Sequence, residues 1–146
     1  MDTLELVKAN LKTHDIHFYE SPERQEVMAM FTIVGRRIEV QVCAEEHGDF
    51  LIIRAGHLFN CPPAHARFKE VAEVLLAANH QYRFVKVSLD PSDGEVIVSG
   101  EAWVRDGSLN DQSFESMFHG VLSVAKSVIE SVDRALAGSD TSKFEC

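Results

Sequence analysis

The feature that most constrains the fold of this chain is a broad apolar band in its last third. Eleven apolar residues recur there at intervals typical of a helix: Phe114, Met117, Phe118, Val121, Leu122, Val124, Ala125, Val128, Ile129, Val132 and Leu136. This spacing predicts one long helix whose band is wider than a narrow stripe. Asn110 is placed to cap its N-terminus and Gly138 to close its C-terminus. Such a helix must be substantially buried.

Five runs upstream of or between the predicted helices have the composition of strands: residues 27–34, 37–44, 50–57, 84–90 and 95–104. The first run is apolar on both alternating sets, which predicts a central strand, whereas the second alternates cleanly and predicts a half-exposed one. Gly35-Arg36 suits a tight turn between these two, and Pro91-Ser92-Asp93-Gly94 suits a four-residue hairpin loop between the last two. We therefore expect an antiparallel sheet.

Two shorter helices complete the pattern. Residues 3–14 have apolar side chains at helical spacing, with Asp2 or Thr3 available as the N-cap. Pro62-Pro63 stops the sheet and begins a helix of residues 64–79. Its expected core positions are Phe68, Val71, Ala72, Leu75 and Leu76. The predicted fold is α+β, in the order α-β-β-β-α-β-β-α, with an antiparallel five-stranded sheet and three helices. We predict one domain over 1–138 and a flexible tail over 139–146.

The last predicted hairpin carries the candidate interaction surface. If Asp90 pairs with Glu95, Val87 lies beside Val98 and one face becomes uniformly aliphatic. The opposite face would then carry four large apolar side chains: Tyr82, Phe84, Ile97 and Trp103. This aromatic area indicates either a contact surface or a face that lies beneath a helix.

The charge of the chain excludes some partners. Lys and Arg number 14 and Asp and Glu number 23, a net charge of −9, which disfavours nucleic acid and anionic lipid. The first residues lack the basic start of a signal peptide, and apolar runs are too short to span a membrane, so we expect a cytoplasmic protein. The three cysteines, Cys43, Cys61 and Cys146, are widely spaced and are expected to be reduced thiols.

Three clusters carry side chains with possible chemistry: His57, Cys61 and His65; Cys43 with His47; and Asp90, Asp93 and Glu95. The first contains zinc ligands but has no evident fourth ligand and a stiff proline pair inside it, so surface histidines and a loop cysteine are the preferred interpretation. In the second, neighbouring glutamates raise the pKa of a thiol, which disfavours a nucleophile. The third is shorter than a calcium loop and fits a solvated turn better. We assign no catalytic, metal or cofactor-binding residue, and expect a protein that is not an enzyme.

The order of elements and several motifs resemble a known family. The helix start Pro62-Pro63-Ala64-His65-Ala66-Arg67, the ending Ala77-Ala78-Asn79 and the hairpin Leu89 to Val96 resemble the YbjN domain family. Asp106-Gly107-Ser108-Leu109 resembles that family's approach to its final helix. The specific part of the resemblance covers residues 61–109, and the element order extends it to about 3–137. The chain departs from the family pattern at 79–83, where it reads Asn-His-Gln-Tyr-Arg.

The resemblance implies a fold like that of type III secretion chaperones and a role as a bacterial sensory transduction regulator. It implies no catalytic residues. The leading functional hypothesis is a protein-binding domain with a regulatory or chaperone-like role, and the alternative is a sensor that binds a small molecule. Because three helices cannot cover both faces of a five-stranded sheet, we also expect uncovered apolar surface and a homodimer.

Overall fold

The computed structural model describes residues 2–137. It contains three helices, α1 (Thr3–Thr13), α2 (Phe68–Gln81) and α3 (Asp111–Ala137). It contains six strands, β1 (Tyr19–Ser21), β2 (Glu26–Ile33), β3 (Arg36–Glu45), β4 (Phe50–Asn60), β5 (Val85–Leu89) and β6 (Glu95–Trp103). Three single 3₁₀ turns, η1 (Pro22–Arg24), η2 (Glu46–Gly48) and η3 (Arg105–Gly107), join some of these elements. The predicted tail, the Gly138 cap and Cys146 lie outside the described residues.

The strands form one antiparallel sheet in the order β1-β2-β3-β4-β6-β5. The predicted antiparallel α+β architecture is confirmed, but the predicted number of five strands is wrong. The additional strand is β1, which pairs Tyr19 with Met28 and Ser21 with Glu26. Its three residues, Tyr-Glu-Ser, have no apolar alternation, so only pairing with β2 makes them a strand.

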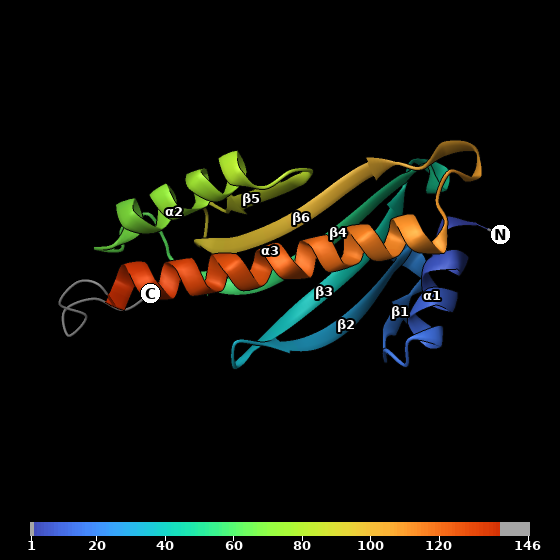
Figure 1. The fold of residues 1–146 in the computed structure, drawn as a ribbon, viewed down its shortest axis with the longest axis horizontal. Helices are drawn as coiled ribbons and strands as arrows, with labels where there is room; N and C mark the ends of the chain where they lie inside the picture. Colours follow the sequence, from blue (N-terminus) through green and yellow to red (C-terminus); the bar gives the residue numbers. More distant parts are fainter. Residues whose placement is uncertain (1, 138–146) are drawn as a thin grey trace.

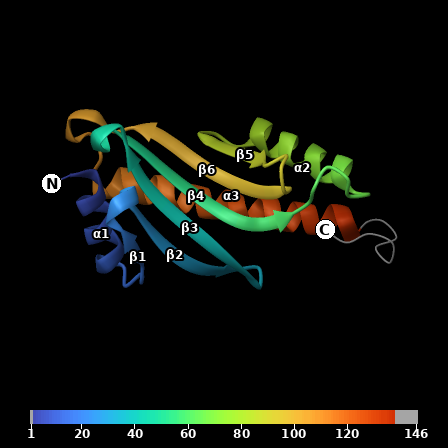
Figure 2. The same ribbon diagram turned by 180° about the vertical axis from the view of Figure 1, so that it is seen from behind.

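All three helices lie on one side of the sheet. Figure 1 shows α3 running along the sheet, and Figure 2, seen from behind, shows the strands in front of the same helix. Helix α3 packs on β4 and β6, α2 packs on α3 and β5, and α1 packs on α3 and β3. The prediction that the last helix lies along a sheet face is confirmed. We call the other side of the sheet the open face.

The core follows from strand alternation. On the helix side, the interior strands contribute fully buried aliphatic residues: Ile38, Val40, Val42, Leu51, Ile53, Ala55, Val96 and Val98. The α3 band packs on them, and its members are all buried or half-buried. Both predicted N-caps are confirmed, since Asp2 Oδ1 accepts from the Glu5 N–H at 2.7 Å and Asn110 Oδ1 accepts from the Ser113 N–H at 2.8 Å.

The predicted register of the last hairpin is also confirmed. The Asp90 N–H donates to the Glu95 carbonyl at 2.9 Å, and Val87 pairs with Val98. The turn between β2 and β3 is one residue earlier than predicted. It consists of Val34 and Gly35, both with positive φ, and Arg36 already belongs to β3.

Three further expectations are wrong in detail. Helix α2 begins at Phe68 rather than 64, because the residues after the prolines form turns in which the His65 N–H donates to the Pro62 carbonyl. Leu76, expected in the core, is 69% exposed on the outer side of α2. Strand β2, expected to be central, lies next to the sheet edge. Met30 on its open face is 42% exposed, because none of the helices described in residues 2–137 covers that side.

Candidate functional site

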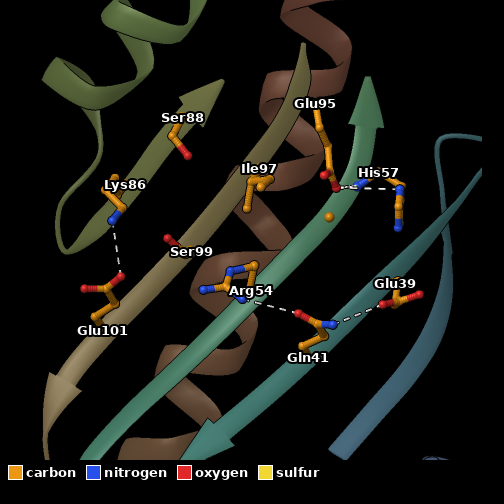
Figure 3. A pocket seen from close by; sticks show the side chains of 11 residues that line it. Glu39, Gln41, Arg54, His57, Lys86, Ser88, Glu95, Ile97, Ser99 and Glu101 are labelled. Carbon is orange, nitrogen blue, oxygen red and sulfur yellow. Dashed lines mark hydrogen bonds and ion pairs between the residues drawn. The ribbon is translucent and has the colours of Figure 1, made fainter. Parts of the chain in front are cut away.

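The open face contains a depression that is lined mainly by polar side chains. It is a shallow trough of about 380 Å³ that crosses β3, β4, β6 and β5 (Figure 3). Its lining residues are Glu39, Gln41, Arg54, Gly56, His57, Lys86, Ser88, Glu95, Ile97, Ser99 and Glu101. Apart from the adjacent Gly56 and His57 of β4, the strands contribute alternate residues, because successive side chains of a strand point to opposite faces.

A chain of polar contacts crosses the floor of the trough. Arg54 Nη1 donates to Gln41 Oε1 at 3.4 Å, and Gln41 Nε2 donates to Glu39 Oε1 at 3.3 Å. On the far side, Lys86 Nζ lies 3.3 Å from Glu101 Oε1, across the β5–β6 pair. Contacts of this kind on an open surface contribute little to stability. They therefore leave charged and amide groups free to exchange partners with a bound molecule.

A bulge in β4 shapes one end of the trough. The register between β4 and β6 shifts between Ala55 and Phe59, and His57 within this segment has a φ of 61°. Glu95 reaches across the bulge, where its Oε1 accepts from the His57 N–H at 3.1 Å and lies 3.6 Å from His57 Nδ1. A Cβ on Gly56 would lie 3.2 Å from the same oxygen, so glycine lets the carboxylate approach the strand closely.

An aromatic cluster marks the other end of the open face. The rings of Trp103 on β6 and Phe50 on β4 pack with centroids 4.8 Å apart, and these two residues are cross-strand partners. The Arg105 guanidinium lies 4.3 Å from the centroid of the Trp103 ring. Trp103 is nevertheless 57% exposed. This end therefore offers an apolar surface beside the polar trough.

The structure divides the four residues predicted as an interaction surface. Ile97 lines the trough and Trp103 lies on the same open face, but Tyr82 and Phe84 do not. Tyr82 lines a small cavity of about 130 Å³ between α2 and α3. The expectation that all four share a face is wrong, because the backbone turns at Phe84 before β5 begins.

The turn at Phe84 is unusual. Phe84 has a φ of 62°, and the Val85 N–H donates across it to the Arg83 carbonyl at 2.8 Å, which closes a strained γ-turn. Its ring is directed to the helix side, against Gly100 of β6 and Gly120 of α3. A Cβ on Gly100 would come within 2.4 Å of the ring. Phe84 is thus a packing residue of the helix side, although 48% of its surface is exposed.

The sequence clusters considered for catalysis and metal binding are not assembled. Cys43 donates to Glu26 Oε2 at 3.5 Å, not to His47, and burial together with this carboxylate raises the pKa of its thiol to about 11. Cys61 is buried while His57 lies exposed in the β4 bulge. Within residues 2–137, no three His, Cys, Asp or Glu side chains converge as a metal site.

The predicted acidic loop after β5 closes on itself. Asp90 Oδ1 accepts from both the N–H and the hydroxyl of Ser92, at 2.9 and 2.7 Å, and the hydroxyl contact is the main reason that the pKa of this carboxyl lies below its usual value. The Asp93 carboxylate accepts from the Glu95 N–H at 2.9 Å. These bonds have the pattern of turn-forming side chains.

Sequence reasoning did not identify the trough as a site. Its signal was present, because Glu39, Gln41 and Arg54 are polar residues at alternate positions of two neighbouring strands. Those positions indicate a half-exposed sheet, but they do not indicate that the exposed halves of four strands adjoin.

The fold of this chain is similar to folds seen in solved structures of other proteins. The chain resembles SchA in the HopA1–SchA chaperone-effector complex (TM-score 0.59, 10% identity, 86% of this chain and 91% of that one). It also resembles a chain of the ExsC–ExsE complex (TM-score 0.56, 16% identity, 89% and 96%). Its fold therefore resembles that of type III secretion chaperones.

The chain belongs to the YbjN family, described as "Putative bacterial sensory transduction regulator", whose model matches residues 3–134. The expectation from the sequence motifs is thereby confirmed. The solved structure of YbjN from E. coli, described as a "putative transcription regulator", is similar over 86% of this chain and 87% of that one, with a TM-score of 0.64 and 16% identity. No curated protein is significantly similar in sequence. In the described part of the chain, no helix has both the length and the apolar content needed to cross a membrane.

Proposed function

We propose that this chain is a non-catalytic protein-binding domain with a regulatory or chaperone-like role, and that it binds its partner on the open face. The observation that carries this proposal is the one-sided arrangement of the fold. Three helices cover one face of the sheet, while the other face presents the trough and the Phe50–Trp103 cluster to solvent. A large surface of mixed polar and apolar character is typical of a protein interface.

The charges of this face favour a basic partner segment. Three carboxylates line the trough, those of Glu39, Glu95 and Glu101, against two basic side chains, Arg54 and Lys86. The chain as a whole, trough included, has a net charge of −9. A segment with Lys or Arg beside apolar residues would complement both the trough and the aromatic end, and charge would steer its approach.

Two structural neighbours support a protein partner. SchA is described in a chaperone-effector complex, and the ExsC–ExsE structure is likewise a complex of two named proteins. The family description and the E. coli neighbour both refer to regulation. We also propose that the protein acts in the cytoplasm, as a homodimer.

A small-molecule sensor remains the second candidate, because the trough is polar-lined and its 380 Å³ falls within the range of ligand pockets. The trough is however open along the sheet, whereas small-molecule sites usually enclose most of the ligand. The geometry therefore favours the extended contact of a protein.

Affinity capture from an extract of the source organism tests the proposal. We would compare the unmodified chain with two open-face variants, Ile97→Lys and Trp103→Ser, and with Leu76→Ser as an exposed apolar control on the helix side. The proposal predicts a protein that is retained by the unmodified chain and the control and is lost from both open-face variants. It also predicts weaker retention at high salt, because screening reduces charge steering. Equal retention by all four baits would place the interface elsewhere.

A further inference from the structure

The sheet has one edge that is only partly covered. Strand β1 pairs with Glu26–Met28 and ends there, so residues 29–33 of β2 have no neighbouring strand on that side within the described chain. Figures 1 and 2 show this stretch of β2 running clear of β1 to the hairpin tip. We call residues 29–33 the β2 edge.

The turn at the hairpin tip determines which backbone groups of the β2 edge are available. Ile33 and Arg36 flank the two-residue turn, so they form a hydrogen-bonded pair with each other. Hydrogen-bonding direction alternates along a strand, so Met30 and Thr32 direct their N–H and C=O groups away from β3. These four groups can pair with another strand.

The opposite edge of the sheet is protected. Asn79 of α2 accepts from the Val87 N–H at 2.8 Å and donates to the Val87 carbonyl at 2.7 Å. Its amide thus occupies the outward backbone groups at the centre of β5, and this blocks a further strand. The β2 edge has no such device in the described structure.

The side chains around the β2 edge suit an apolar contact. Residues 27–34 contain no charged side chain, which is unusual in a chain of net charge −9. Met30 is 42% exposed and Val34 is 48% exposed. Val34 also has a φ of 50°, a conformation that costs a β-branched residue free energy and that turns normally give to Asn, Asp or Gly. A long, uncharged edge of this kind is a template for strand pairing.

We propose that the β2 edge pairs antiparallel with the β2 edge of a second copy, across a two-fold axis at Phe31. In this register Met30 lies opposite the partner's Thr32 and Thr32 lies opposite the partner's Met30, so the outward groups of both strands form four hydrogen bonds. A second copy fits because its edge is equally uncharged, whereas the rest of its acidic surface would be repelled. This inference rests on the homodimer proposed above and names its interface.

The first test is the mass in solution, measured by light scattering at about 1 to 100 µM. The unmodified chain should approach twice its single-chain mass of 16.3 kDa as concentration rises. Met30→Pro removes an outward N–H without removing a bond to β3, and Thr32→Lys adds a charge to the edge; both should stay near 16.3 kDa. Leu76→Ser and Trp103→Ser should behave like the unmodified chain. Thr32→Lys keeps the test valid if the proline variant fails to fold.

The second test fixes the register by cross-linking in a Cys146→Ser background. A mixture of Met30→Cys and Thr32→Cys chains should form a disulfide between unlike chains, since those positions are opposite each other. Leu76→Cys chains should not. A dimer that forms without this cross-link and is unaffected by the edge variants would overturn the β2 interface and leave the homodimer standing. A monomer at every concentration would overturn both, and edge variants that lose a captured protein instead would show that the edge binds a different partner.

Discussion

Phe84 and the two glycines beside it show how one residue can hold two elements together. Its strained γ-turn directs the ring between β6 and α3, where Gly100 and Gly120 leave room for it. Gly100→Ala should lower the free energy of unfolding by about 1–3 kcal/mol, because the new Cβ overlaps the ring. In a Phe84→Ala background the same change should cost less. Urea unfolding of the four chains measures this coupling, and an equal cost in both backgrounds would contradict it.

The buried Cys43 thiol makes the free energy of unfolding depend on pH in the alkaline range. Burial, and then the Glu26 carboxylate, raise the pKa of its thiol from 9.0 to about 11. A raised pKa means that the folded state favours the protonated thiol, so this contribution is fully present below pH 9.0 and is lost as the pH rises toward about 11. The stability of the unmodified chain should fall more steeply over this interval than that of Cys43→Ser. Parallel curves for the two proteins would show that the thiol contributes nothing.

At the scale of elements, the sequence predicted secondary structure best where the residue pattern lies within a single helix or hairpin. The α3 band and the β5–β6 loop are local patterns, and both are confirmed. Strand β1 has no pattern of its own and exists through its pairing with Met28. Leu76 has the spacing of a core residue, but in the described part of the chain it is exposed on the outer side of α2. Such errors arise because hydrophobic periodicity predicts which residues share one face of an element. It does not predict whether another element packs against that face.

The β5 edge gives a prediction at this scale. Asn79→Leu removes both side-chain bonds to Val87 and should lower the free energy of unfolding by about 1–3 kcal/mol. It should also increase aggregation, because the edge of β5 becomes available to other chains. His80→Leu adds the same side chain at the adjacent exposed position and serves as the control. Thermal unfolding and light scattering measure the two effects, and equal behaviour of the variants would contradict the role of Asn79.

At the scale of the whole molecule, the distribution of apolar residues explains why the site was only partly predictable. Met28, Met30, Ile52 and Ile97 have the composition of a core, yet they lie on the open face. The expected uncovered apolar surface does exist, but α3 contributes little of it, because its band is buried or half-buried. Which face the helices cover is decided by packing between distant segments, and no local pattern of β2 or β4 reports it.

Binding of a protein at the open face can be measured directly at Trp103, because it is the only tryptophan of the chain. Incorporating 5-fluorotryptophan would give one fluorine resonance from the open face, with no signal from an unlabelled partner. On titration with the captured protein, we expect this resonance to shift and its response to solvent isotope to decrease, as water leaves the ring. A complex that forms by light scattering while the resonance keeps its position and its solvent response would contradict binding at this face.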